Sequence, residues 1–598
     1  MPRFTSQPTI SRPRMTFTPW KARGAAVSSA LLLAAAFPPL NWWPLALVAM
    51  VPLLLAVWSR SAGRSKAFHA LFLPSTTAKE AIGGGGLDIP GREAQGLGGL
   101  AADAVRERHR PEAGAPVFWR GFRLGWLFGF VFFTATLWWI QHVTIAGMLA
   151  LTAYLALYPA LAMGLAGWLG LNPEAGWAAN WGKAFLTATI WCGLEWVRSV
   201  ALWGFPWNGL AVPLFSMVGM RVISSLTGVV GLAAIVVLVQ CLFVARLLSS
   251  GRVGRHTGVS LFLLCLGWAG WEIFAGGALR VPELTASVGR GPLQAEFHAI
   301  LLQPNITMEQ KLSPDPEVQR QRYFDLVSQT DAALASAAGP EGKLKVDLVV
   351  WPESAVPGFF DDMVKGGAFI DQLEQGDFTL VTGADHREWD KLYNSIAIMR
   401  GTPENRAIHP KIRLVPFGEF IPFRKEVPLF EKMLGHLIPM DFNAGTSLEP
   451  MKVGGQPFSI VPLVCFEDTI GDHARKFIRE EPQVIVNVTN DNWFHESPAT
   501  EMHFANARWR AAELRRTLIR SANTGVTAIV SPWGSVQRLP SHQPGVLAGT
   551  FYTGRGEITF YARHGGFFSQ CSGVLALIGC LGVAWIRQKT NPERAPAG

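Results

Sequence analysis

Long apolar runs separated by short polar connections occupy the first 280 residues of the chain. Each run approaches the roughly 20 residues that an α-helix needs to cross a bilayer. The first run is interrupted at 37–44, where prolines and tryptophans favour a turn between two short spans. The pattern predicts seven transmembrane helices before residue 280 and an eighth near the C-terminus. The runs lie at 24–59 (two spans), 122–142, 146–169, 183–203, 221–247, 257–278 and 567–587.

The pattern changes between the seventh and eighth spans. Short apolar runs rich in β-branched residues alternate there with helix-like segments at 317–337 and 502–521. This alternation is typical of α/β layers rather than of a β-sandwich. The candidate strands are 298–303, 346–351, 378–382, 395–399, 459–465, 484–488 and 527–530.

Composition supports this division. The 598 residues are 49% hydrophobic and only 16% charged, which is too apolar for an ordinary soluble protein. The sequence therefore predicts a membrane domain at 1–280, an α/β domain at 281–565, and a final helix with a tail at 566–598. Residues 60–118 are rich in glycine and mixed charges and predict a cytoplasmic loop within the membrane domain.

The net charge of +9 is distributed as membrane topology requires. Five Lys or Arg residues precede the first span, and no acidic residue occurs before Glu80. Basic segments stay on the cytoplasmic side, so both termini are expected inside and the α/β domain outside the cytoplasm. The placement argues against nucleic-acid binding. A cleaved signal peptide is the rival interpretation of the N-terminus, but a second span follows at once.

Glu195 and Arg198 lie three residues apart within a predicted span. Ionisable groups are costly in a bilayer, so a functional role is one interpretation. A mutually neutralising pair that helps the helices to pack is the other, and the sequence does not decide between them.

Cys465 is the one cysteine outside the apolar spans. It ends a strand-like run and is followed by acidic residues and glycine, the position at which open α/β sheets carry their chemistry. A packed core cysteine is the alternative. No metal-ligand spacing accompanies it, so neither a metal nor a cofactor is expected.

Two further polar motifs follow apolar runs. The first is Trp351-Pro-Glu353, and the second places Lys411 and Glu419 eight residues apart around an apolar segment. In this order the motifs resemble the Glu-Lys-Cys triad of the nitrilase (carbon–nitrogen hydrolase) superfamily. With seven spans before and one after, the chain resembles the apolipoprotein N-acyltransferases, the integral-membrane branch. Supporting matches are Tyr393-Asn-Ser395, Asn487-Val-Thr-Asn-Asp-Asn-Trp493 and Arg520-Ser-Ala-Asn523-Thr-Gly525.

The resemblance implies an αββα sandwich outside the cytoplasmic membrane of a bacterium. It implies Cys465 as nucleophile, Glu353 as general base and Lys411 as the cation near the oxyanion. Glu419 would orient Lys411 or assist proton movement, and the two positions after the nucleophile, Phe466 and Glu467, matter for activity. One position departs from the family, because Leu312 stands where a tryptophan is common.

The implied reaction moves the sn-1 acyl chain of a phospholipid, typically phosphatidylethanolamine, through a Cys465 thioester to the amino group of a diacylglyceryl-cysteine lipoprotein. A membrane-tethered amidase with water as acceptor is the second interpretation. A non-catalytic binding domain is the third. Apolar residues beside the motifs are expected to form mobile arms that admit lipid, with core packing or an oligomer contact as the alternative. These residues are Phe359, Phe360, Phe430, Met433, Leu434 and Leu437.

Overall fold

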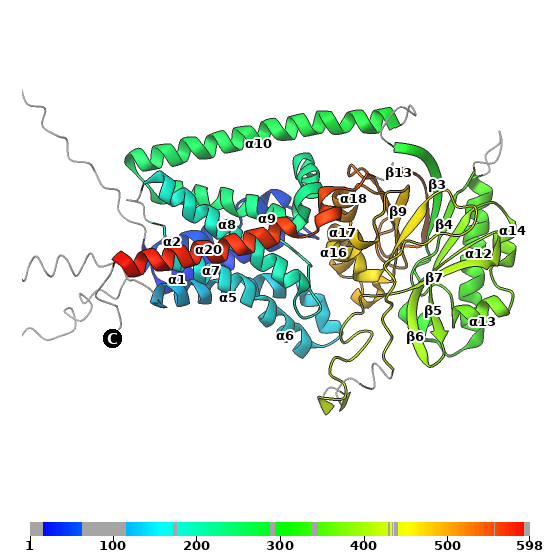
Figure 1. Ribbon diagram of the computed structural model, residues 1–598. Helices are drawn as coiled ribbons and strands as arrows, with labels where there is room; N and C mark the ends of the chain where they lie inside the picture. The colour runs from blue at the N-terminus through cyan, green and yellow to red at the C-terminus, as the bar shows by residue number, and fades with distance from the viewer. Residues whose placement is uncertain are drawn as a thin grey trace, which may run out of the picture.

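The computed structural model of the protein shows a bundle of helices packed end to end against an α/β body (Figure 1). The last helix, α20, returns from the α/β body to lie along the bundle. The structure describes residues 16–61, 115–171, 176–286, 293–337, 345–428, 431–432, 435, 440–554 and 557–590. Most of the predicted loop 60–118 lies outside these ranges.

The bundle follows the apolar runs of the sequence. Among the described residues, five helical segments are long and apolar enough to cross a membrane: Val117–His142, Ile145–Leu169, Val218–Leu248, Gly251–Gly277 and Phe567–Thr590. The other predicted spans are helical but shorter or less apolar, so the total of eight stays a prediction. The helices are α1 Pro19–Ala35, α2 Val51–Trp58, α5 Ala115–Leu137, α6 Ile145–Leu155, α7 Leu157–Leu169, α8 Trp177–Val200, α9 Val218–Leu248, α10 Gly251–Ala286 and α20 Phe567–Thr590. Strands β1 Thr16–Phe17 and β2 Arg60–Ser61 pair beside them.

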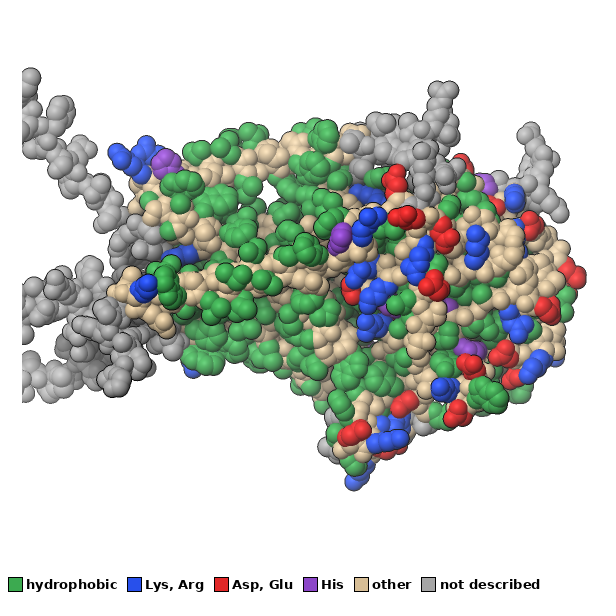
Figure 2. Space-filling view, viewed as in Figure 1, with side chains coloured by type: hydrophobic (Ala, Val, Ile, Leu, Met, Phe, Trp, Pro, Cys, Tyr) green, Lys and Arg blue, Asp and Glu red, His purple; other side chains and the backbone are tan. Residues whose placement is uncertain are grey.

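Figure 2 shows hydrophobic side chains over the surface of the bundle and charged side chains mainly on the α/β body. A surface of this kind suits a bilayer, because lipid replaces the water that would otherwise contact the apolar groups. The helix α10 is the extreme case, with only 6% of its apolar window buried.

Two sheets make up the centre of the α/β body. The six-stranded sheet has the order β13-β3-β4-β5-β6-β7, and the five-stranded sheet has the order β12-β11-β10-β9-β8. Side chains from both sheets, such as Leu301, Val350, Ile460 and Val486, share one core between them. The strands are β3 Leu293–Gln303, β4 Leu348–Val350, β5 Thr379–Glu388, β6 Lys391–Arg400, β7 Thr402–Pro410, β8 Ser459–Val464, β9 Gln483–Thr489, β10 Leu518–Ala522, β11 Ala528–Val530, β12 Val536–Arg538 and β13 Gly545–Gly554.

Helices cover the outer faces of both sheets and complete four layers. Residues of α12 and α13 pack on the six-stranded sheet, and residues of α17 and α18 share a core with the five-stranded sheet and the bundle. The αββα order therefore has one helical layer pressed against the membrane helices. The helices of this body are α11 Met308–Leu312, α12 Pro316–Ala337, α13 Phe360–Lys365, α14 Ile370–Glu374, α16 Gly471–Ala474, α17 Ala499–Ala507, α18 Trp509–Leu514 and α19 Phe560–His564.

The predicted helix 502–521 is wrong at its C-terminal end. Arg515 adopts a left-handed conformation with φ of 49° and ends α18. The chain then enters β10, which pairs in parallel with β9, and Leu518 is fully buried there. Tertiary pairing overrides the helical periodicity at this point.

The α/β body contacts the helical bundle at a break in α9. Gly228 has φ of 68°, which a side chain would oppose, and a Cβ there would lie 2.4 Å from the Tyr561 ring. The break leaves the backbone N–H of Val229 without a helical acceptor, and Glu513 of α18 accepts it at 2.7 Å. A carboxylate of the α/β body thus completes the hydrogen bonding of a membrane helix.

Trp509 is a large side chain at the junction between the bundle and the α/β body. It is fully buried, its Nε1 donates to Val212 O at 3.0 Å, and its ring meets Phe215 edge-on at 5.1 Å. We expect Trp509→Ala to destabilise the protein by about 3–5 kcal/mol, because it opens a cavity and leaves a carbonyl unpaired. Thermal unfolding in detergent measures the loss. Trp389→Ala is the control, since Trp389 is 91% exposed and its removal should leave the midpoint unchanged.

Candidate active site

The three predicted triad residues all follow strands. Glu353 comes after β4, Lys411 directly after β7, and Cys465 directly after β8. Since β5 pairs antiparallel with β6, and β6 with β7, strands β4 and β7 run in the same direction. Their C-terminal ends therefore lie on the same side of the six-stranded sheet. The residue after β9, in the other sheet, contacts this side, because Asn490 N donates to Glu353 Oε2 at 2.7 Å.

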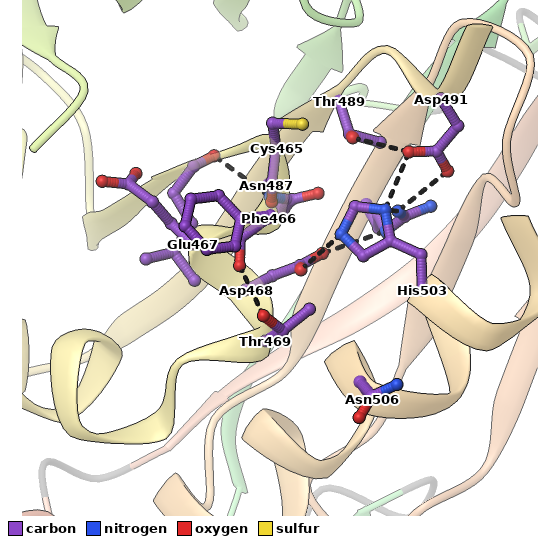
Figure 3. A network of polar contacts seen from close by, with 12 residues as sticks. Cys465, Phe466, Glu467, Asp468, Thr469, Asn487, Thr489, Asp491, His503 and Asn506 are labelled. Carbon is purple, nitrogen blue, oxygen red and sulfur yellow. Dashed lines mark hydrogen bonds and ion pairs between the residues drawn. The ribbon is translucent and has the colours of Figure 1, made fainter. Parts of the chain in front are cut away.

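The backbone of Cys465 is held in an unusual conformation. Its φ is 54°, in the left-handed region that few residues other than glycine adopt. A side chain of the neighbouring strand β9 holds this turn, because Asn487 Nδ2 donates to Cys465 O at 2.9 Å. Strain of this kind persists only where neighbours enforce it, and here it turns the thiol out of the strand (Figure 3).

A chain of hydrogen bonds joins the acidic residues to the lysine. Asn394 Nδ2 donates to Glu353 Oε1 at 2.7 Å and to Glu419 Oε1 at 2.9 Å. Lys411 Nζ donates to the same Glu419 oxygen at 2.9 Å. Asn394 therefore keeps two carboxylates at a fixed separation. Sequence reasoning quoted this asparagine only as part of a motif match and missed its bridging role.

Electrostatics within the site favour a neutral thiol beside a charged lysine. Burial, and then the nearby Glu353, raise the pKa of Cys465 well above its usual range, although Lys411 opposes this. For Lys411, burial opposes the charge, but Glu419, Cys465 and Glu353 together raise its pKa. The free site thus holds a protonated thiol, with the Glu353 carboxyl group and the Lys411 ammonium near enough to influence its pKa.

The Glu467 carboxylate accepts hydrogen bonds from backbone N–H groups of two segments. It accepts from Val464 N at 2.8 Å, and from Ile412 N and Arg413 N at 2.9 and 2.8 Å. Although burial opposes its charge, the neighbouring His473, and then the bond from Arg413 N, lower the pKa of Glu467 to about 2. One buried carboxylate therefore ties the segment after Lys411 to the turn that carries the thiol.

The remaining predicted positions have different surroundings. The Phe466 ring centroid lies 5.8 Å from Lys411 Nζ, within range of a cation–π contact. Leu312, at the end of α11, is 68% exposed. Another carboxyl that sequence reasoning missed is Asp385, which pairs with Asn394 across β5 and β6. Burial, opposed by Lys311, raises the pKa of Asp385 to about 6.

The candidate lipid-access residues are only partly described. Phe359 is half-buried and lies under Arg387, whose Cζ is 4.1 Å from the ring centroid. Phe360 is 1% exposed and packs against Phe369 in the core, which favours the core-packing alternative for this residue. Phe430, Met433, Leu434 and Leu437 lie outside the described residues.

A buried charge network lies beneath the nucleophile turn (Figure 3). His503 Nε2 lies 2.9 Å from Asp468 Oδ1, and its Nδ1 lies 2.8 Å from Asp491 Oδ1. Arg520 contacts the second oxygen of each aspartate at 3.1 Å. All four side chains are fully buried. Burial opposes the charge on His503, but the two aspartates raise its pKa to about 9.

The bundle contacts this network directly. Trp207, in the connection between α8 and α9, stacks on the His503 ring at 5.2 Å. Its carbonyl accepts from Arg198 at 2.8 Å, as does that of Phe205, and Arg198 pairs with Glu195 at 3.4 Å. These contacts favour a packing role for the Glu195–Arg198 pair. Within the described residues, no cluster of His, Cys, Asp and Glu side chains could hold a metal ion.

Two family models match the chain. Residues 113–242 match the apolipoprotein N-acyltransferase N-terminal domain, and residues 312–552 match the carbon-nitrogen hydrolase family. A relative named apolipoprotein N-acyltransferase, from Rhizobium leguminosarum bv. trifolii, is 31% identical over 70% of this chain and 77% of its own. The chain belongs to the apolipoprotein N-acyltransferase family. A relative of the same name from Geobacter metallireducens is 30% identical over 77% of this chain and 87% of its own.

The chain also shows a limited similarity to solved structures. A carbon-nitrogen hydrolase from Helicobacter pylori covers 43% of this chain and 89% of its own, with 15% identity and a TM-score of 0.32. The nitrilase Nit3 of Saccharomyces cerevisiae covers 43% and 91%, with 13% identity and a TM-score of 0.30. The family-model match to the carbon-nitrogen hydrolases spans the five-stranded sheet, strands β4 to β7 of the six-stranded sheet and the three candidate catalytic residues.

The raised pKa of His503 predicts a pH-dependent stability. The folded pKa of about 9 exceeds the ordinary value of about 6.5. The network therefore contributes its full stability below pH ~6.5 and loses it as the pH rises through 9. The difference amounts to about 3 kcal/mol. Thermal midpoints measured from pH 6 to 10 should fall more steeply for the parent than for His503→Gln, which cannot titrate. Parallel curves would contradict the assignment.

Proposed function

We propose that the protein N-acylates lipoproteins, taking the sn-1 acyl chain of a membrane phospholipid through a thioester on Cys465. The observation that carries this proposal is the hydrogen-bonded chain Glu353–Asn394–Glu419–Lys411 beside a thiol on a strained turn. Its placement on a body packed against apolar helices puts this chemistry within reach of lipid. Family membership supports the lipoprotein acceptor.

In the first half-reaction, the Cys465 thiol adds to the ester carbonyl and gives its proton to Glu353. Lys411 and the backbone N–H of Phe466 stabilise the oxyanion. Collapse of this intermediate breaks the bond to the glycerol oxygen, which takes the proton from Glu353 and leaves with the lysophospholipid. The raised pKa of the thiol suits this order, because proton transfer accompanies attack rather than preceding it.

In the second half-reaction, the α-amino group of a diacylglyceryl-cysteine attacks the thioester carbonyl. Glu353 takes a proton from the amine, and the Cys465 sulfur leaves and recovers that proton. The products are an amide on the lipoprotein and the free enzyme. Glu419, which shares an oxygen between Asn394 and Lys411, keeps the ammonium oriented through both steps.

We propose phosphatidylethanolamine as the usual donor and the bacterial cytoplasmic membrane as the location. Residues 281–565 then form the catalytic domain on the periplasmic face, with both chain termini in the cytoplasm. The basic N-terminus supports this orientation, because no acidic residue precedes Glu80. Residues 1–280 and 566–598 form the membrane-embedded part.

Lipid access is proposed for the segment that follows Glu419. Its described aromatic residues touch the bundle, since Trp203 meets Phe420 and Phe423 at centroid distances of 6.3 and 5.9 Å. Phe423 and Met440 are 57% and 62% exposed. We assign Phe430, Met433, Leu434 and Leu437 to the same mobile arm from their sequence, together with Phe359 on the opposite arm.

The proposed mechanism passes through an acyl group bound covalently to Cys465. With phospholipid carrying a labelled sn-1 chain, the parent protein should acquire a label that hydroxylamine removes, and Cys465→Ser should not. Electrophoresis of both proteins in detergent measures this. Adding a diacylated lipopeptide should then move the label to the peptide. Spontaneous loss to water at the same rate would support the amidase alternative, and a label on neither folded protein would remove the support for Cys465.

The Asn394 bridge is expected to contribute to the rate of acyl transfer. We expect Asn394→Ala to lower the rate of thioester formation roughly 100-fold, because the glutamates lose the donor that spaces them. Single-turnover labelling measures the rate. Asn405→Ala is the matched control, since Asn405 is an exposed asparagine of β7 whose side chain donates to the backbone carbonyl of Arg400. Equal rates for the two variants would show that the bridge does not contribute.

A further inference from the structure

A second polar cluster lies where the α/β body meets the start of α9. Arg221 comes from the first turn of α9, Arg508 and Arg515 flank α18, and Trp533 lies in the turn between β11 and β12. These four residues are named the boundary cluster below. Segments far apart in sequence thus bring three guanidinium groups to one place.

Aromatic faces and carbonyl oxygens hold these groups. Arg508 Cζ lies 4.5 Å from the centroid of the Phe215 ring, and Arg515 Cζ lies 4.2 Å from that of Trp533. Arg515 donates to Pro532 O at 2.7 Å. Arg221 donates to Trp533 O at 3.0 Å and to Phe215 O at 2.6 Å. The arginines are therefore oriented before any ligand arrives.

Two of the three guanidinium groups, those of Arg508 and Arg515, have no carboxylate paired with them among the described residues. The nearby Glu501 pairs with Arg538, and Glu272 accepts from Gly219 N. Burial lowers the pKa of Arg508 and of Arg515 to about 10, and repulsion from Arg221 adds to this in both.

Two hydrogen-bond donors of the cluster also lack acceptors. Arg508 Nε and Trp533 Nε1 are buried and have no partner among the described residues. A buried donor without an acceptor is unfavourable, so the cluster is incomplete without a ligand that brings oxygen atoms and negative charge. A phosphate group meets both requirements, because its oxygens accept several N–H groups at once.

The surroundings indicate where such a phosphate would come from. A Cβ at Gly219, two residues before Arg221, would lie 2.5 Å from the Trp271 ring, so α10 lies beside α9 at this level. From here α10 exposes Ile273, Leu266 and Phe262, which are 78%, 56% and 65% exposed. Lys and Arg side chains gather along the edge where the apolar surface ends (Figure 2). This is the level of lipid headgroups, with room for acyl chains along the helices.

We propose that Arg221, Arg508, Arg515 and Trp533 bind the phosphate of an anionic phospholipid, which docks the α/β body on the bilayer. The site is separate from the acyl-transfer centre, and its lipid is retained rather than consumed. The guanidinium and indole N–H groups contact the phosphate oxygens. The acyl chains lie against the exposed faces of α9 and α10.

The test uses the full-length protein in a non-ionic detergent, titrated with phosphatidylglycerol and observed by native mass spectrometry. The double variant Arg508→Gln/Arg515→Gln should bind the first lipid at least about 10-fold more weakly, since it loses two charge-assisted contacts. Arg563→Gln is the matched control. Arg563 lies in α19, outside the boundary cluster, and already pairs with Glu480, so its replacement should leave the affinity unchanged.

A milder variant separates binding from folding. Trp533→Phe keeps an aromatic ring beneath Arg515 but has no ring N–H to donate, and it should weaken binding about 3-fold with little change in the thermal midpoint. If the double variant does not fold, Trp533→Phe decides the question. Parent affinity in that variant, or in a folded double variant, overturns the proposal.

Competition distinguishes the two sources of phosphate. Inorganic phosphate at 10 mM should not displace phosphatidylglycerol from the parent protein, because it lacks the acyl chains. Displacement would show a site for a free anion and would overturn the lipid assignment. Neither result depends on thioester formation, so failure here is distinguishable from failure of the proposed acyl transfer.

Discussion

The ion network around His503 is the constraint on which the catalytic geometry depends. Two aspartates, a histidine and an arginine are fully buried there, and removing any one would leave an uncompensated charge. Its members come from the nucleophile turn, the loop after β9, α17 and β10. Because these charges must stay paired, the four segments hold one arrangement, and the strained backbone of Cys465 is maintained within it.

The same constraint makes the membrane bundle part of the enzyme rather than an anchor. Trp207 covers the His503 ring from the bundle side, and Arg198 holds the carbonyl of Trp207. In the other direction, Glu513 supplies the acceptor that the break at Gly228 requires. Each body therefore satisfies groups that the other would leave buried and unpaired. Cutting the chain between them would expose polar groups as well as apolar surface.

The sequence predicted elements that depend on local pattern. Apolar runs located the bundle, and the seven candidate strands became β3, β4, β5, β6, β8, β9 and β11. It also placed Glu353, Lys411 and Cys465 at strand ends. It missed β7 and β10, whose polar or arginine-containing segments become strands only through their partners. The bridge made by Asn394 was equally hidden. Its two acceptors, Glu353 and Glu419, lie 41 and 25 residues away in the sequence, and only the fold brings them together.

The burial of the site bears on why acyl transfer would prevail over hydrolysis. Lys411 is 1% exposed and Glu353 is 7% exposed, so both side chains lie in a largely dry interior. In the proposed mechanism a thioester formed there would meet little water, and the amine of the acceptor would be the nucleophile. Under this proposal Glu353, which would have released its proton to the departing glycerol oxygen, would then accept a proton from the amine. The raised pKa of Cys465 favours its departure as a protonated thiol, which makes return of that proton from Glu353 the step that resets the site.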